Sequence, residues 1–329
     1  MVVISPAHTQ DMTTHINIIS RSNGVGLDQD ANLLKSSLEA DGMKVTLSHC
    51  RAIKPWSWMF GGKNKFDANI FLERCFPRWF HCSSVNLLIP NQERFPERHL
   101  KHLKKIDHVL CKSKHAEAIF SKHADACFIG FSSPDRNDPS VTPDYQSFLH
   151  LAGKSTLKGT ETILELWAKH PEWPELTLIQ HASNAPDQVP SNVTLISDYL
   201  SNEELSNQLN SHGVHLCPSR SEGWGHYIVE AMSCSAVVLT TDAPPMNELV
   251  TAERGCLVPF NRSEPRHLGT NFFISATVLE EQLTQFMQLQ PSKKQQLGFT
   301  AREWFETNQA SFVSRIQNTL NEILSSAKK

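Results

Sequence analysis

The stretch that decides the fold is PSRSEGWGHYIVEAM, residues 218–232. An apolar strand candidate at 214–217 ends where this stretch begins, and a short loop then carries Glu222. Two glycines follow and open a predicted helix that holds Glu230. A strand that passes through a glycine-bearing loop into a helix is the repeating unit of an α/β fold.

The start of this helix predicts an anion site. The backbone N–H groups of Gly223, Trp224 and Gly225 stand where a helix offers them no internal partner. The positive end of the helix dipole favours an anion at the same place. Glu222 and Glu230 flank it, and an ionised carboxylate accepts hydrogen bonds from sugar hydroxyls. The alternative is that both glutamates only complement the helix dipole.

Outward from this stretch, short apolar runs alternate with helical patterns, which predicts parallel strands joined by crossover helices. Strands are expected at 15–20, 43–47, 67–72, 85–89, 109–112, 126–131, 148–152, 176–180, 193–196, 214–217 and 236–240. Helices are expected at 29–41, 115–123, 160–170, 202–210, 225–234, 279–288, 292–308 and 312–326. The polar, proline-bearing stretch 132–143 predicts a linker between two α/β domains that face a central crevice.

Composition excludes several classes of protein. The 329 residues carry 31 Lys and Arg against 34 Asp and Glu, a formal charge of -3, which disfavours a nucleic-acid partner. No apolar run approaches the ~18 residues that a membrane span needs. The first residues lack the pattern of a signal peptide, and the eight cysteines form no C-x-x-C pair. These features predict reduced thiols and a cytoplasmic location.

The central stretch resembles the Glu-x7-Glu motif of retaining GT-B glycosyltransferases of family four, also described as glycosyl transferases group 1. The matching residues are Pro218, Ser219, Glu222, Gly223, Gly225, Glu230, Ala231 and Met232. The resemblance implies two Rossmann-like domains and a terminal helix that crosses back to the first. The domains are then 1–143 with 309–329, and 144–308. It also implies that Glu222 faces the donor sugar and that Glu230 binds the nucleotide ribose.

A second match lies in residues 153–159, GKSTLKG, between a strand and a helix. Two cations in such a loop are suited to stabilising a diphosphate leaving group. The family has arginine where this chain has Lys154, and the loop to Lys158 is one residue shorter. A lysine lacks the bidentate fork of arginine, so the geometry at the phosphate changes. The alternative is that both lysines are solvated loop residues.

The remaining donor-side candidates are weaker. The resemblance places Tyr199 near the base, and Gly24 and Gly26 form a turn after the first strand that could approach the donor phosphate. The family commonly has a glycine close after the motif helix, whereas this chain has Ser235, which is less comfortable there if its φ is positive.

The acceptor is expected on the first domain. Glu73 follows the strand at 67–72, and Asn91 and Glu93 follow the strand at 85–89, so all three would face the crevice. Loop solvation is an equal alternative for them. The apolar stretch 56–60 beside Lys54 and Lys63 fits either a buried core or a peripheral contact with a membrane.

The sequence thus predicts a glycosyltransferase that moves a sugar from a nucleotide-diphosphate donor to an acceptor hydroxyl with retention. Glu222, Lys154 and Lys158 are its catalytic candidates. No His, Cys and carboxylate cluster has ligand spacing, so no metal or other cofactor is expected. The acceptor would be a glycan or glycolipid of a bacterial surface. Two alternatives remain: a sugar-nucleotide epimerase of the same fold, and a non-catalytic relative that binds glycan or nucleotide.

Overall fold

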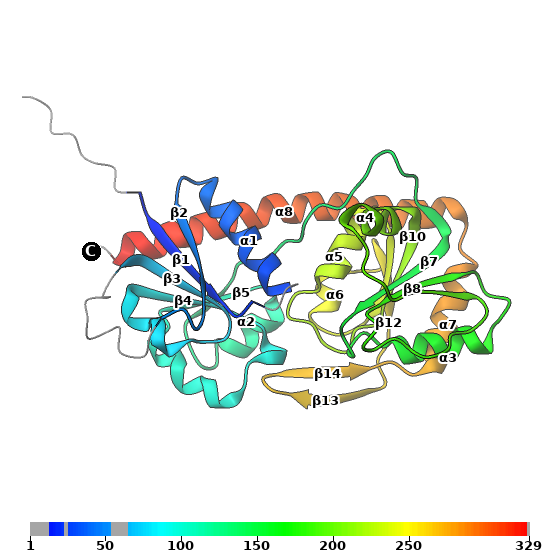
Figure 1. Cartoon of the computed structure of the whole chain (residues 1–329), viewed down its shortest axis with the longest axis horizontal. Helices are drawn as coiled ribbons and strands as arrows, with labels where there is room; N and C mark the ends of the chain where they lie inside the picture. Colours follow the sequence, from blue (N-terminus) through cyan, green and yellow to red (C-terminus); the bar gives the residue numbers. More distant parts are fainter. Residues whose placement is uncertain (1–12, 23–25, 54–64, 328–329) are drawn as a thin grey trace, which may run out of the picture.

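A computed structural model of the chain describes residues 13–22, 26–53 and 65–327. Gly24 and the stretch 56–60, both singled out above, lie outside these residues. Figure 1 shows two α/β units side by side, with one long helix along both.

The first sheet contains six parallel strands in the order β2-β1-β3-β4-β5-β6. Its strands are β1 (His15–Ser20), β2 (Lys44–His49), β3 (Phe66–Glu73), β4 (Ser83–Pro90), β5 (His108–Cys111) and β6 (Ala126–Phe128). Its helices are α1 (Gly26–Glu39) and α2 (Lys114–Phe120), with 3-10 helices η2 (Pro77–Cys82), η3 (Gln92–Arg94) and η4 (Glu97–Lys105). Strands β3 and β4 are buried over most of their length, as expected for a parallel sheet covered on both faces.

The second sheet also has six parallel strands, in the order β12-β11-β10-β7-β8-β9. Its strands are β7 (Asp144–Gly153), β8 (Leu176–Gln180), β9 (Val193–Ile196), β10 (His212–Cys217), β11 (Val237–Thr241) and β12 (Gly255–Val258). Its helices are α3 (Thr160–Lys169), α4 (Asn202–Ser211), α5 (His226–Ser233), α6 (Met246–Leu249) and α7 (Ala276–Met287). This is the doubly wound order of a Rossmann sheet.

The order of the strands reverses once in each sheet. In the first sheet the reversal lies between β1 and β3, and in the second between β7 and β10. In open α/β sheets, ligands bind at this point, outside the carboxyl ends of the strands. The two reversals therefore mark where each domain presents its loops to a ligand.

An antiparallel hairpin of β13 (Arg262–Arg266) and β14 (Gly269–Phe273) departs from the prediction of an all-helical region after 265. It extends beneath the second sheet toward the first (Figure 1). A Cβ added at Gly269 would lie 3.1 Å from the Cα of Glu93, so the hairpin touches η3 of the first domain. The sequence analysis also missed β12, the edge strand just before this hairpin.

The C-terminal helices predicted at 292–308 and 312–326 are one helix, α8 (Pro291–Ala327). It crosses back to the first domain, as expected for this fold. Its apolar residues Phe312, Ile316, Leu320 and Leu324 are buried. The Gln317 side-chain amide donates to the carbonyl of Ser37 over 2.8 Å, which ties the helix to α1.

The break expected near 308–312 is absent, and two polar side chains of this part of α8 bind other parts of the chain. The Asn308 amide donates to the carbonyl of Phe131, and the Arg315 Nε donates to the carbonyl of Ile129, each over 2.8 Å. Asn308 and Arg315 thus bind the chain that leaves the first sheet, and the helix continues through both.

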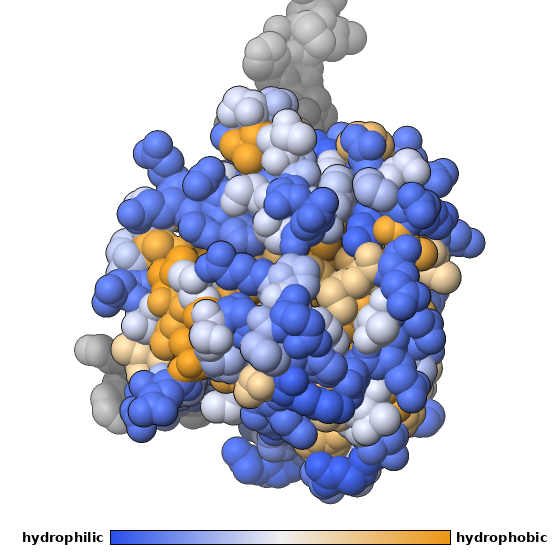
Figure 2. Space-filling view, turned by 90° about the vertical axis from the view of Figure 1, so that its right-hand side faces the viewer, coloured by the Kyte–Doolittle hydropathy of each residue, from blue (hydrophilic) through white to orange (hydrophobic). Residues whose placement is uncertain are grey.

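None of the helices in the described residues is long and apolar enough to cross a membrane. The end of the molecule formed by the second sheet is largely hydrophilic, with hydrophobic residues in separate areas (Figure 2).

Candidate functional site

The two motif loops meet at the strand reversal of the second sheet. One follows β7 and ends at Gly159, and the other follows β10 and begins at Pro218. Gly159 has a φ of +73°, and a Cβ there would lie 2.7 Å from the carbonyl oxygen of Pro218. Glycine is required on both counts, because the backbone is left-handed and the loops are in close contact.

Glu222 and Lys158 form an ion pair across these loops. The Lys158 Nζ lies 2.5 Å from the Glu222 Oε1, and each side chain is only 15% exposed. The hydroxyl of Ser219 donates to the same oxygen over 2.5 Å. The ammonium also lies 3.4 Å from the centroid of the Tyr227 ring. Burial raises the pKa of Tyr227 well above its usual value, which keeps this ring neutral beside the pair.

The glycines of the motif lie against both domains. Gly225 has a φ of +108° and precedes the first residue of α5. A Cβ at Gly223 would lie 2.5 Å from the Cγ of Asn91 in the first domain. Trp224 is buried, and its Nε1 donates to the hydroxyl of Ser133 over 3.3 Å. The start of α5 is therefore packed at the domain boundary, where the sequence predicted an anion site.

Glu230 is buried in α5 and held by residues that the sequence analysis did not select. The Gln29 side-chain amide, from α1 of the first domain, donates to the Glu230 Oε1 over 2.7 Å. The Arg136 guanidinium lies 3.5 Å from the same oxygen. Protein donors thus occupy the carboxylate that the resemblance assigns to the ribose.

A buried ionic network joins the domains beside this helix. His226, the first residue of α5, places its Nε2 2.7 Å from the Oδ1 of Asp30 in α1. The Lys112 Nζ lies 2.5 Å from the Oδ2 of Asp30 and donates to the Asn91 amide oxygen over 3.1 Å. Burial alone would raise the pKa of Asp30, but Lys112 and His226 hold it below its usual value. Asp30 is therefore ionised, and its contact with His226 links the first domain to the second.

Residues Gln92 and Glu93 extend the same boundary from η3. The Gln92 amide donates to the carbonyl of Glu222 over 2.9 Å. Glu93 is 5% exposed, and its Oε2 is buried with no hydrogen-bond partner among the described residues. Burial, with a further contribution from Glu222, raises the pKa of Glu93 to about 7. Glu93 is thus the carboxyl of the crevice that changes charge near neutral pH.

Glu73 ends β3 in a left-handed conformation, with a φ of +68°. It pairs with the neighbouring Arg74, and its carbonyl accepts from the N–H of Asn91 over 3.5 Å. Glu73 is thus linked to Asn91, which lies against Gly223, and Gln92, the residue before Glu93, binds the carbonyl of Glu222. A non-glycine residue at positive φ is strained and persists where the surroundings hold it.

Three other candidates lie apart from this cluster. Lys154 is exposed, and its backbone carbonyl accepts from the side chain of Asn184. Tyr199 is 91% exposed. Gly26 begins α1, and a Cβ there would meet nothing within 4 Å. The roles of these residues stay predictions.

The sequence analysis missed Asp30, Lys112, His226, Gln29 and Arg136. Their partners lie far away in the sequence, either elsewhere in the same domain or in the other domain or the linker, so no local pattern joins them. Lys112 carried a signal that could have been used, because it directly follows the apolar run 109–111, whereas Asp30 lies among polar residues and carried none. In the described parts of the chain, no three His, Cys, Asp or Glu side chains gather closely enough to hold a metal.

Comparison with known proteins adds to this geometry. Residues 188–294, which include the Glu222 and Glu230 loop and helix, match the family described as Glycosyl transferases group 1. No curated protein matches the chain. Sucrose-phosphate synthase from Thermosynechococcus elongatus superimposes with a TM-score of 0.71 at 15% identity, covering 95% of this chain and 100% of that one. The fold is GT-B.

Two further GT-B structures show the same likeness. A glycosyltransferase from Rickettsia africae gives a TM-score of 0.74 at 13% identity, covering 97% of this chain and 99% of that one. Anabaena HepE, solved with UDP and glucose, gives 0.67 at 14% identity, covering 95% and 100%. At such identities these structures establish the GT-B fold and nothing finer.

Proposed function

We propose that this protein is a glycosyltransferase that moves a sugar from a nucleotide-diphosphate donor to an acceptor hydroxyl with retention, without a metal. The observation that carries the proposal is the Lys158–Glu222 pair. It joins the two loops at the strand reversal of the second sheet, within 2.5 Å. A cation and a carboxylate at this point suit a diphosphate and a sugar hydroxyl, respectively. The family match over residues 188–294 supports the same reaction class.

The reaction needs little covalent chemistry from the protein. The bond from the sugar C1 to the diphosphate oxygen breaks, and its electron pair leaves with the diphosphate. The acceptor oxygen forms the new bond to C1 on the same face, and its proton passes to the leaving phosphate oxygen. Lys158 and the N–H groups at the start of α5 would stabilise the charge that develops on the diphosphate. Glu222 would orient the donor sugar.

Donor entry must rearrange the pairs seen in the structure. Lys158 has to turn from Glu222 toward the diphosphate, and Gln29 has to leave Glu230 when a ribose binds. Lys158 then gains the diphosphate, and Glu222 and Glu230 each gain a sugar hydroxyl, so no buried charge is left without a partner. The donor would thus replace contacts that now close the site.

The family match favours a transferase over the epimerase and the non-catalytic relative that the sequence left open. An acceptor that is a glycan or glycolipid of a bacterial surface, a cytoplasmic location and a peripheral contact with a membrane complete the proposal. The acceptor would approach from Glu73, Asn91 and Glu93.

The test is incubation with a panel of nucleotide sugars, with release of nucleotide followed by chromatography. We expect one donor to be turned over, the rate to survive EDTA, and NMR of the product to show the anomeric configuration of the donor. An inverted product would refute retention, and loss of the rate in EDTA would refute metal independence. If Glu222→Gln and wild type release nucleotide equally fast, the Glu222 site is not the catalytic centre.

A further inference from the structure

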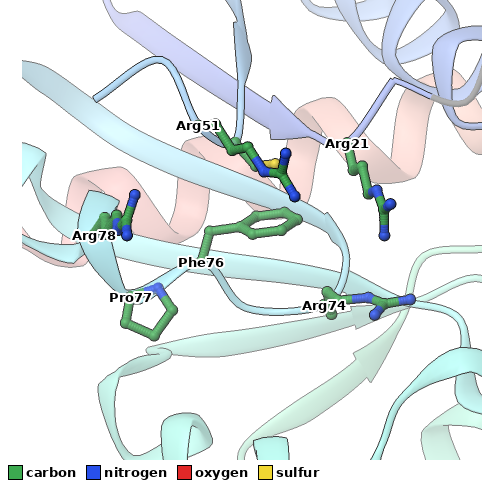
Figure 3. Close-up of a pocket in the computed structure, with 7 residues that line it drawn as sticks. Arg21, Arg51, Arg74, Phe76, Pro77 and Arg78 are labelled. Carbon is green, nitrogen blue, oxygen red and sulfur yellow. The ribbon is translucent and has the colours of Figure 1, made fainter. Parts of the chain in front are cut away.

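Four arginines converge on one pocket of the first domain. The pocket has a volume of about 310 Å³ and is lined by Arg21, Cys50, Arg51, Arg74, Phe76, Pro77 and Arg78. Figure 3 shows Arg21, Arg51 and Arg74 on the side of the Phe76 ring and Arg78 beside Pro77. None of these lining residues is acidic, although the whole chain has a formal charge of -3.

These guanidinium groups are largely uncompensated. Within the described ranges, the side chains of Arg21, Arg51 and Arg78 form no ion pair, and all three residues are exposed. Like charges gathered in one pocket repel one another, and here no carboxylate in the lining offsets that cost. By contrast, Arg302 on α8 is paired with Asp135 at 2.5 Å. The pocket therefore presents an excess of positive charge to whatever enters it.

Arg74 is the inner member of the cluster. Its side chain is 24% exposed and pairs through Nη2 with Glu73, whose φ is positive. Its Nε is buried and has no hydrogen-bond partner in the part of the chain that is described. A buried donor without an acceptor costs free energy, and an anion bound beside Arg74 would offset it.

The pocket lies where the fold predicts a ligand. Arg21 follows β1, Arg51 follows β2 and Arg74 follows β3, and these strands surround the reversal of the first sheet. The pocket is also linked to the donor loops through a series of residue contacts. Arg74 adjoins Glu73, whose carbonyl accepts from Asn91, and Asn91 contacts Gly223. Only Glu73 and Asn91 thus separate Arg74 of this pocket from Gly223 of the motif loop in that series of contacts.

We propose that the arginine pocket binds a phosphate group carried by the acceptor. The inference rests on the proposed function and names the substrate class of its acceptor side. Guanidinium groups bind phosphate through paired, charge-assisted hydrogen bonds, and several together fit a dianion. The Phe76 ring forms an apolar wall that suits the hydrocarbon or sugar face next to that phosphate. The phosphate belongs either to a phosphorylated sugar or to a lipid headgroup.

Calorimetry with glucose 1-phosphate, and with glucose as the uncharged match, tests the soluble source. We expect the phosphate ester to bind and glucose not to. The double variant Arg21→Gln/Arg51→Gln should lose about tenfold or more in affinity for it. Arg21→Lys/Arg51→Lys should recover part of that loss, because the charge stays while the fork is lost. Arg262→Gln, which removes an exposed arginine of the β13 hairpin, should bind as wild type does.

Sedimentation with vesicles tests the lipid source. Vesicles of phosphatidylglycerol in phosphatidylcholine should retain wild type, and the Gln double variant should bind about tenfold less. Binding to either probe that depends on Arg21 and Arg51 supports the proposal and identifies the source. Thermal unfolding of each variant shows that it is folded. If neither probe depends on these arginines, the proposal is wrong.

The donor site also binds phosphates, so Lys158→Ala is measured alongside. Glucose 1-phosphate binding that is lost in Lys158→Ala but kept in the Gln double variant places the phosphate at the donor site and overturns the inference. The two proposals fail separately. Arginine-dependent binding without turnover of any nucleotide sugar refutes the transferase and keeps the pocket. Turnover with no preference for phosphorylated acceptors refutes the pocket and keeps the transferase.

Discussion

The charged side chains at the two strand reversals are arranged in opposite ways. At the second sheet, Lys158 and Glu222 neutralise each other at 2.5 Å, largely out of solvent. At the first sheet, Arg21, Arg51 and Arg78 surround a pocket with no acidic residue in its lining. The same topology thus supports one site that is internally paired and another that is left positive.

The two sites therefore place different requirements on a ligand. A ligand at the paired site must replace contacts that already exist, so its binding depends on geometry and on movement of the two side chains. A ligand at the positive pocket needs only to bring negative charge, so its binding should weaken as salt screens the exposed arginines. The residues between the sites, Asn91 and Glu93, join them across the crevice.

The largest expected effect tests the paired site. Lys158→Ala should lower turnover by about 3–4 kcal/mol in transition-state free energy, because one contact to a developing charge is lost. Lys154→Ala, in the same loop but exposed, should cost much less. Steady-state kinetics with the accepted donor measures both, and Lys154→Arg shows whether the residue typical of the family improves the rate. Equal losses in the two alanine variants would contradict the role assigned to the Lys158–Glu222 pair.

The next prediction concerns Glu93, which lies between the sites. Its pKa is about 7 in the fold against an ordinary value of 4.5, so the folded state holds a proton that the unfolded state loses first. The contribution of Glu93 to stability should therefore fall by about 3 kcal/mol as pH rises from 4.5 to 7. The buried His150 and His215, whose pKa values are lowered to about 4, act in the opposite direction over this range. Urea unfolding across this range measures the slope.

Glu93→Gln should remove only the contribution of Glu93, since the amide keeps the shape and cannot ionise, so its stability should rise more steeply with pH than that of wild type. Glu97→Gln, in the exposed η4, is the matched control and should keep the wild-type slope. The same slope in Glu93→Gln as in wild type would show that Glu93 does not contribute to it.

Much of the fold could be predicted because its strands are short apolar runs between helical patterns. The hairpin at 262–273 could not, since RSEPR is polar and contains Pro265, and its strand is exposed. Such a strand forms only by pairing with β14 against the first domain. The unbroken α8 was missed because Asn308 and Arg315 act through distant carbonyls.

The two sites also differ in how far they could be predicted from the sequence. The donor loops could be predicted because each motif is continuous in sequence, from 153 to 159 and from 218 to 232. The arginine pocket could not, because Arg21, Arg51 and Arg74 follow three strands and meet only through the sheet order β2-β1-β3. The Asp30–His226 contact likewise joins two domains across 196 positions of the chain.

A smaller effect is expected at the ribose carboxylate. Glu230→Ala should weaken nucleotide binding by about 1–3 kcal/mol, because a pair of ribose hydroxyls would lose its charged acceptor. Gln29 allows a second test, because its amide competes with the ribose for Glu230. Gln29→Ala removes the protein donor that competes for Glu230, so it should strengthen nucleotide binding slightly. Calorimetry measures both, and an unchanged dissociation constant in Glu230→Ala would refute the ribose assignment.

The smallest effect compares backbone strain at the two sites. Ser235, just after α5, and Glu73, beside the arginine pocket, both have positive φ, at +58° and +68°. Ser235→Gly should stabilise the protein by about 0.5–1 kcal/mol, since relief of the left-handed strain exceeds the entropic cost of glycine. Glu73→Gly relieves similar strain but removes the partner of Arg74, so we expect no net gain. Urea unfolding of both variants measures the difference, and equal gains would show that the Glu73–Arg74 pair contributes nothing to holding the pocket.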